Sequence, residues 1–171
     1  AFDFALGFTN YDTTLPWYLG CGQGTYNAPT EVFDTWTPEN PKLFTVMYSL
    51  YEEDKLIDLV ESYFGMRKIS IENGKFLLNN RTYYQKLLLD QGYWPQGLMT
   101  PCDDDYVKDI KLAKSMGFNG VRKHQKVEDP RFLYHADKMG FLVWGEIAAA
   151  YVYSSKYVKR ITNEWMDAIE R

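Results

Sequence analysis

The sequence has little cysteine, no long apolar run and no excess of positive charge, and each shortage excludes a class of protein. Its two cysteines, Cys21 and Cys102, lie far apart and form no metal-binding spacing such as Cys-x-x-Cys. We therefore expect two free thiols, no metal site and no cofactor. No apolar stretch approaches the roughly 20 residues of a membrane-spanning helix, so no membrane partner is expected. Basic residues number 19 against 23 acidic ones, without a basic stripe, so no nucleic acid partner is expected either.

Apolar and aromatic residues are plentiful. The chain has 171 residues, of which 46% are hydrophobic and 17% aromatic, and it includes 14 tyrosines and 5 tryptophans. A chain of this length forms one or two domains with a buried core. Aromatic rings most often fill cores and interfaces, but they also provide flat surfaces on which sugar rings stack.

The stretch 118–146 predicts a strand, a helix and a second strand. Asp129 is a candidate N-cap, Pro130 suits the first helical position, and Gly140 suits a left-handed helix end. The predicted helix has an apolar face formed by Phe132, Leu133, Ala136 and Met139. The following run 141–144, Phe-Leu-Val-Trp, is typical of a strand buried on both faces of a parallel sheet.

The same order of elements extends on both sides of this stretch. Residues 85–91 predict a strand, and Asp103 is expected to cap a helix that runs to about Met116. A third helix is expected after Ser154 or Ser155. The apolar faces of these two helices are Tyr106, Ile110, Ala113 and Met116 in the first, and Val158, Ile161, Trp165 and Ala168 in the second. The chain therefore predicts three β/α units.

The first half of the chain predicts strands and turns. Glycine and proline punctuate residues 1–41, and strands are expected over 42–51 and 56–64. Residues 70–78 predict a hairpin, because the Asn73-Gly74 dipeptide suits a type I′ turn in which both residues have positive φ.

The stretch 118–146 resembles the signature of the family 2 glycoside hydrolases, which include β-galactosidases, β-glucuronidases and β-mannosidases. That signature has an Asn-x-apolar-Arg run, two small residues and a His, then an Asp and a Gly before an apolar strand that ends in an acidic residue. The matching positions are Asn119, Arg122, Asp137, Gly140 and Glu146. One position departs from the signature, because its His falls on Gln125 while His124 stands one residue earlier. Either His124 takes the role through a shifted turn, or the chain belongs to a branch with another sugar preference.

The resemblance covers about residues 30–171 and implies an α/β fold. Residues 1–66 would form the C-terminal part of a truncated immunoglobulin-like β-sandwich. Residues 67–171 would form the first three β/α units of a partial TIM (β/α)8 barrel, with the 70–78 hairpin at the N-terminal face of that barrel.

Polar side chains follow each predicted barrel strand, at the end where barrel enzymes place their chemistry. By resemblance, we expect these residues to converge and to bind sugar hydroxyls. The candidate substrate-binding residues are Asp90, Gln91, Trp94, Arg122, His124, Gln125 and Glu146. Structural alternatives stand beside them, since Glu146 could simply pair with Arg122 and His124 could be a structural histidine. Tyr93 and Trp144 compete with Trp94 as the stacking ring, and His135 is expected to be structural.

The two catalytic residues are expected to be absent from this chain. Retaining glycosidases use two carboxylates, which the family places at barrel strands four and seven, with the acid/base in an Asn-Glu dipeptide. The one such dipeptide here, Asn163-Glu164, lies in a predicted helix and is expected to be a solvated helix face.

These observations predict a fragment of a retaining, β-galactosidase-like hydrolase acting on β-linked terminal sugars. It would be inactive alone, and oligomeric or prone to aggregate without the remainder of the barrel or another copy of the chain. A non-catalytic carbohydrate-binding or scaffold module is the alternative, and an enzyme whose site forms between chains is a third reading.

Overall fold

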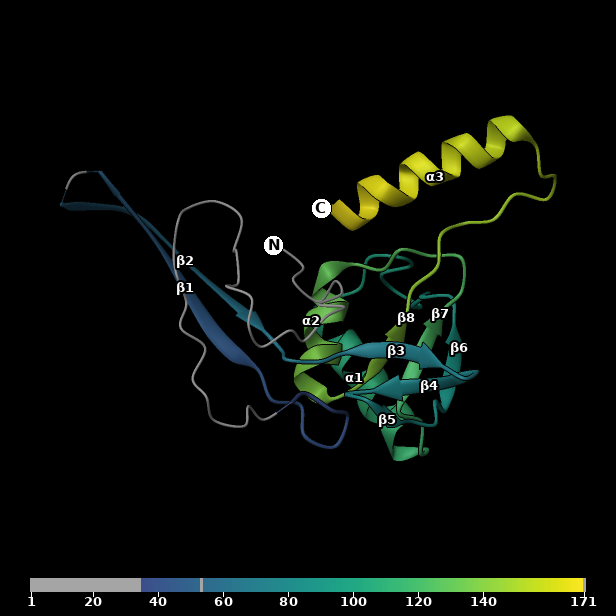
Figure 1. The fold of residues 1–171 in the computed structure, drawn as a ribbon, viewed down its shortest axis with the longest axis horizontal. Coiled ribbons are helices and arrows are strands. Elements are labelled where there is room, and N and C mark those ends of the chain that lie inside the picture. The colour runs from purple at the N-terminus through teal and green to yellow at the C-terminus, as the bar shows by residue number, and fades with distance from the viewer. Residues whose placement is uncertain (1–34, 53, 171) are drawn as a thin grey trace.

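The computed structural model describes residues 35–52 and 54–170, which form three small sheets and three helices (Figure 1). Expectations that concern Cys21 and the turns before residue 35 lie outside the described residues. The elements, in chain order, are β1 (Phe44–Glu52), β2 (Lys55–Phe64), β3 (Ile69–Glu72), β4 (Lys75–Leu78), β5 (Arg81–Thr82), β6 (Leu87–Asp90), α1 (Asp103–Ser115), β7 (Gly120–Lys123), α2 (Pro130–Met139), β8 (Leu142–Trp144) and α3 (Ser155–Glu170).

A three-stranded parallel sheet with the order β6-β7-β8 carries the second half of the chain. Leu88 pairs with Val121, which in turn pairs with Val143. These three side chains pack on the same hydrophobic core as α1 and α2, so both helices cover one face of the sheet. The predicted succession of strands and helices is therefore confirmed, although no barrel closes among the described residues.

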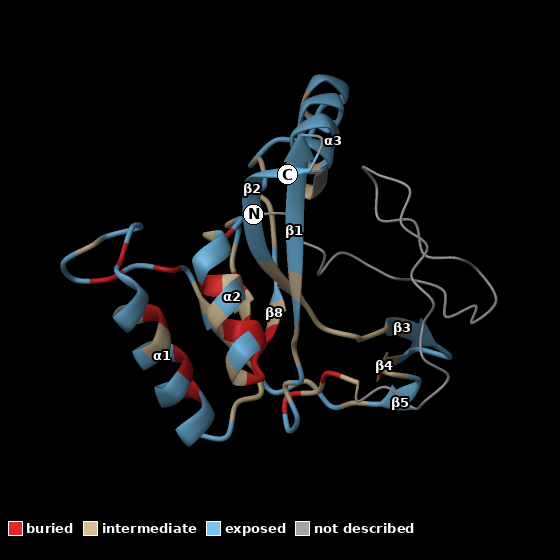
Figure 2. Cartoon of the chain, turned by 90° about the vertical axis from the view of Figure 1, so that its left-hand side faces the viewer, coloured by how far each residue is buried: buried red, intermediate tan, exposed pale blue. Residues whose placement is uncertain are grey.

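The core lies between α1, α2 and this sheet. Figure 2 shows the buried faces of α1 and α2 turned toward each other. Fully burying one large apolar side chain contributes about 1.5–3 kcal/mol. The buried core residues are Trp94, Tyr106, Ile110, Ala113, Val121, Phe132, Ala136 and Phe141.

Two expectations about burial were wrong. Met116 is 58% exposed rather than part of the buried face of α1, because the helix ends at Ser115 and Met116 has left the helical conformation. The strand β8 is not buried on both faces, since Trp144 is 51% exposed. Trp144 pairs with Arg122 on the sheet face opposite the helices.

The helix ends follow local chemistry, with one correction. In α2, the Asp129 carboxylate accepts a hydrogen bond from the backbone N–H of Arg131, and Gly140 adopts φ 67° at the end, as predicted. In α1, the N-cap is Cys102 rather than Asp103. Asp105 accepts the backbone N–H of Cys102 at 3.3 Å, which completes the turn one residue earlier than expected. Cys102 is an exposed free thiol.

The third helix begins after Ser154, whose hydroxyl accepts the backbone N–H of Tyr157 at 3.2 Å. Ile161, Trp165 and Ala168 share its half-buried face, whereas Val158, expected on that face, is exposed. Figure 1 shows α3 beyond the carboxyl end of the sheet rather than in the layer of α1 and α2. Among the described residues, no helix combines the length and apolar character needed to cross a membrane.

The first half of the described chain forms two antiparallel sheets. β1 and β2 make a long two-stranded ribbon that projects away from the parallel sheet (Figure 1). β3 and β4 form the predicted hairpin, in which Asn73 has φ 51° and Gly74 has φ 72°, as a type I′ turn requires. The following strand β5 completes this second sheet.

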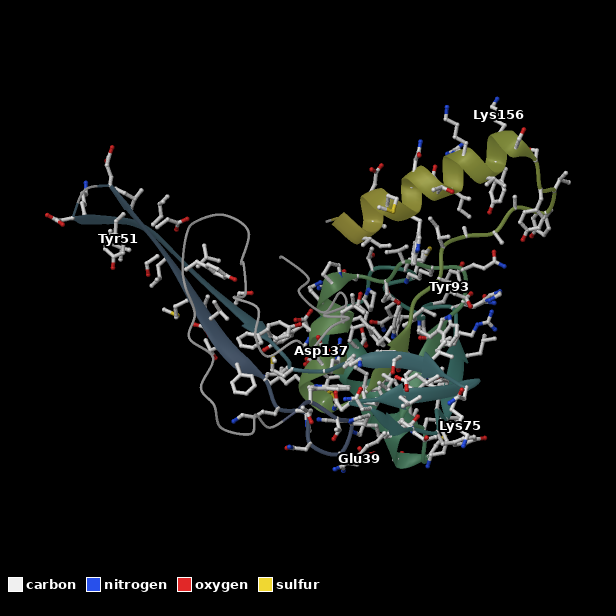
Figure 3. The ribbon with its side chains drawn as sticks, viewed as in Figure 1. Glu39, Tyr51, Lys75, Tyr93, Asp137 and Lys156 are labelled. Carbon is white, nitrogen blue, oxygen red and sulfur yellow. The ribbon has the colours of Figure 1, made fainter. Side chains whose placement is uncertain are left out.

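Trp36 joins the ribbon end of the chain to α2. Its fully buried indole N–H donates to the backbone carbonyl of Asp137 at 2.8 Å, and the Arg67 guanidinium lies 4.6 Å from its ring centroid. Arg67 and the Tyr63 hydroxyl both donate to the Asp137 carboxylate, at 2.6 Å and 3.3 Å. Asp137, labelled in Figure 3, is therefore the centre of this contact.

Candidate functional site

Four polar residues meet where β7 and β8 end, and we call them the polar cluster: Arg122, His124, Gln125 and Glu146. Arg122 Nε donates to one Glu146 carboxylate oxygen. The other oxygen accepts the backbone N–H of Gln125 at 2.9 Å and lies 3.5 Å from His124 Nδ1. Arg122, His124 and Gln125, three of the expected strand-end residues, thus converge on Glu146.

Strand geometry explains which side chains reach this cluster. Successive residues in a strand point to opposite faces, so Arg122 points away from the helices while Val121 and Lys123 point toward them. Gln125 follows in the left-handed conformation, with φ 52°. A non-glycine residue held there stores roughly 1–3 kcal/mol of strain. The hydrogen bond from its N–H to Glu146 offsets part of that strain.

The cluster favours an ionised Glu146. The hydrogen bond from Arg122 lowers the pKa of the Glu146 carboxyl below its usual value, and the Gln125 N–H lowers it further. The four side chains are partly exposed, and Glu146 also borders a pocket of about 340 Å³ between α2, β8 and α3. A carboxylate acceptor beside guanidinium and imidazole groups is suited to bind hydroxyl groups.

We expect this carboxylate to stabilise the fold above the ordinary pKa of glutamate, about 4.3. A carboxyl whose folded pKa is lowered loses its stabilising effect as pH falls from the unfolded pKa through the folded one. Urea midpoints of the wild type and Glu146→Gln, measured from pH 7 to pH 3, should therefore converge at the acid end. A gap that stays constant over this range would contradict the assignment.

Asp90 lies at the same strand end but does not join the cluster. Its carboxylate accepts from Lys123 Nζ at 2.5 Å and from the backbone N–H of Gly92 at 2.7 Å. Asp90 is in register with Lys123 and shares its helix-facing orientation. The expectation that Asp90 faces a common space with Arg122 and Glu146 was therefore wrong, because strand alternation separates them. Gln91, next in the chain, is exposed.

Trp94 is a core residue rather than an open stacking ring. It is 7% exposed, its indole N–H donates to Asp109 at 2.7 Å, and Tyr106 packs against it edge to face. This burial corrects the expectation that Trp94 stacks on a sugar. Its two competitors, Tyr93 and Trp144, are exposed, and Tyr93 is labelled in Figure 3.

Asn119, another signature position, and His135, which is not part of the signature, both hold the scaffold together. Asn119 accepts the backbone N–H of Lys86 at 2.7 Å and donates to the carbonyl of Tyr84 at 2.8 Å, which ties down the chain before β6. His135 packs against Tyr134 and lies 3.3 Å from Asp103, as a structural histidine would.

Glu164 of the Asn-Glu dipeptide lies on the exposed side of α3, as expected. Its carboxylate accepts from Arg160 Nε at 2.6 Å. Within residues 35–52 and 54–170, no group of three or more His, Cys, Asp or Glu side chains is placed to hold a metal ion.

Lys123, which was not among the residues expected at the site, is fully buried beneath the cluster. The only available signal was its place in the strand, between Arg122 and His124, which turns it to the helix-covered face.

Comparisons with known proteins identify relatives of this chain. The family model described as Glycosyl hydrolases family 2 matches residues 22–67. A β-glucuronidase of Streptococcus agalactiae is 30% identical over 123 residues, which are 70% of this chain and 20% of that protein. A β-galactosidase of Pseudoalteromonas haloplanktis is 30% identical over 65% of this chain and 11% of its own length.

Solved structures show the same likeness. A family 2 β-galacturonidase of Eisenbergiella tayi, bound to galacturonate, superposes with a TM-score of 0.66 at 28% identity, over 74% of this chain and 22% of that one. A family 2 member from Bacteroides cellulosilyticus gives 0.68 at 25% identity, over 79% and 19%. The chain spans a fifth or less of the two curated relatives' length. The signature residues, the family match and these relatives together show that the chain belongs to family 2 of the glycoside hydrolases.

Proposed function

We propose that this chain is the sugar-contacting part of an enzyme that hydrolyses β-linked terminal sugars with retention of configuration. The observation that carries this proposal is the polar cluster, in which the Glu146 carboxylate accepts from Arg122 and lies beside His124 at the carboxyl ends of parallel strands. In barrel enzymes, residues at this end of the strands contact the substrate.

The proposal assigns two parts to the chain. Residues 1–66 are the end of an immunoglobulin-like domain, and residues 67–171 are the start of a TIM barrel. The antiparallel ribbon of β1 and β2 and the family match over residues 22–67 support the first part. The parallel sheet of β6, β7 and β8 with its crossover helices supports the second. The acid/base and the nucleophile belong to further strands of the barrel.

The sugar is a β-galactoside or a β-linked uronic acid. Relatives of this chain are named β-galactosidase and β-glucuronidase, and one similar structure holds galacturonate. The cluster can serve either class, because Glu146 accepts hydrogen bonds from hydroxyls while Arg122 and His124 can donate them.

Sugar binding to the 171-residue chain tests this proposal. Titration of the 15N-labelled chain with methyl β-galactoside and with methyl β-glucuronide should shift the Gln125 amide and the Arg122 Nε resonances. Glu146→Gln should raise the dissociation constant for the preferred sugar roughly tenfold, because the charged acceptor is lost. Arg160→Met, which removes an exposed ion pair on α3, is the control and should bind normally. Resonance shifts confined to residues outside the cluster would overturn the assignment of the site.

The same samples should hydrolyse neither sugar, because removing either carboxylate role abolishes a two-carboxylate mechanism. Chromogenic β-galactosides, β-glucuronides and β-mannosides provide the assay. Turnover that survives repurification and is lost in Glu146→Gln would show instead that this chain is catalytic by itself.

A further inference from the structure

Lys123 is a fully buried charge directly beneath the polar cluster, on the opposite face of β7. Its ammonium lies 2.5 Å from an Asp90 carboxylate oxygen and 2.9 Å from Glu128 Oε2. It also lies 3.8 Å from the centroid of the Phe132 ring. A buried ammonium is tolerated only when such partners replace its lost water.

The Lys123 partners belong to a balanced network that spans two loops. Lys126 Nζ lies 2.9 Å from Glu128 Oε1 and donates to the carbonyl of Gly92 at 3.2 Å. Glu128 also accepts the backbone N–H of Asp129, the N-cap of α2. Two ammonium groups thus face the carboxylates of Asp90 and Glu128, and the loop after β6 is tied to the loop after β7.

The packing around Gly92 shows how closely this network is fitted. Gly92 has φ 69°, and a Cβ built there would lie 2.6 Å from Lys126 Nζ and 2.8 Å from Glu128 Oε2. A methyl group at Gly92 would therefore require the side chains of Lys126 and Glu128 to shift.

Lysines of the network stand directly before and after His124 and Gln125 in the chain. The backbone N–H of His124 donates to the carbonyl of Asp90 at 2.8 Å, and Lys123 and Lys126 flank the pair on both sides. Gln125 has the unfavourable φ of 52° that aims its N–H at Glu146. The chain before and after this strained residue is thus fixed by buried ion pairs.

We propose that Lys123 is a positioning residue of the sugar site, which holds His124 and Gln125 against Glu146 through its ion pairs with Asp90 and Glu128. This inference rests on the proposed function, because it gives Lys123 a role in sugar binding. The contacts of His124 and Gln125 with Glu146 that it explains exist without sugar. A residue that only stabilised the core would change the resistance to urea and leave the Glu146 contacts intact.

Two charge-neutral variants test this role. Lys123→Met combined with Glu128→Gln removes one charge of each sign, so it leaves no unpaired buried carboxylate at Glu128. Gly92→Ala leaves every charge in place, and it strains the loop through its φ of 69° as well as through the close approach of its methyl group to Lys126 and Glu128. The matched control is Ile110→Val, a core change in α1 that touches none of these ion pairs.

The readout is the pH titration of the Gln125 amide resonance in sugar-free samples, because this N–H donates to Glu146 and reports the protonation of that carboxylate. Both test variants should raise the titration midpoint toward the ordinary glutamate value, by about half a pH unit or more. Ile110→Val should lower the urea midpoint without moving the titration. An unchanged titration midpoint in either test variant that folds would overturn the proposal. Failure of the wild type to bind sugar would overturn the proposed function and leave this result unaffected.

Discussion

Replacing Gly140 with alanine should destabilise the chain by about 2–4 kcal/mol. Gly140 ends α2 with φ 67°, a conformation that costs an alanine roughly 1 kcal/mol. A Cβ there would also lie 2.3 Å from the carbonyl oxygen of Pro38 and 2.9 Å from its carbonyl carbon. Both clashing atoms are backbone atoms of a buried residue, so relief requires that the 36–38 segment move away from α2. Such overpacking typically adds about 1–3 kcal/mol.

Gly117→Ala is the matched control for this effect. Gly117 has φ 88°, but no atom lies within 4 Å of the position that its Cβ would take. This control should therefore show only the conformational cost of about 1 kcal/mol. Urea unfolding of the two variants measures the difference. Equal losses of unfolding free energy in the two variants would show that the contact with Pro38 contributes nothing.

This contact gives two signature residues a structural role. Asp137 holds Trp36, Arg67 and Tyr63, and Gly140 allows the close approach of Pro38. Both positions dock α2 onto the end of the ribbon, and neither makes a hydrogen bond or ion pair with the cluster around Glu146 among those that the described residues form. A signature that reads as one functional motif thus divides into a scaffold part and a site part.

Local chemistry made the second half of the chain predictable. Asp129, Pro130 and Gly140 mark the ends of α2 through their own side chains and backbone freedom, and Asn73-Gly74 fixes its turn in the same way. Such signals depend on a few neighbouring residues, so the sequence shows them directly.

The details of the site depend on contacts between distant residues. The side chain of Asp90 points to the helix-covered face because Asp90 is in register with Lys123 on the next strand. Trp94 is buried because its indole N–H bonds to Asp109 of α1 and its ring packs against Tyr106 of α1. Neither fact is visible in the residues around Asp90 or Trp94. Strand-end position therefore predicted which residues gather at this end of the sheet, while the pairing across the sheet determined which of them share a face.

The purified chain should associate at micromolar concentration, because its described part leaves apolar strands uncovered. β6 and β8 are the edges of the parallel sheet, and β1 and β2 form a ribbon without a third strand among the residues that the structure describes. Edge strands present unpaired backbone groups that favour pairing with another chain. Along the ribbon, Leu50 and Val60 are 61% and 50% exposed. Contiguous apolar surface of this kind is typical of interaction sites and of aggregation.

Light scattering during size-exclusion chromatography measures this association, and a paired substitution tests its cause. Leu50→Lys with Val60→Glu places charges on one face of the ribbon, and the new positive charge lies opposite Asp58 in the register of β1 and β2. Because burying each original side chain contributes about 1.5–3 kcal/mol, the concentration at which association begins should rise at least roughly tenfold. Leu112→Glu, a change at an exposed position on α1, should leave it unchanged. A wild-type chain that elutes as a monomer and unfolds cooperatively would show that residues of this chain already cover these strands.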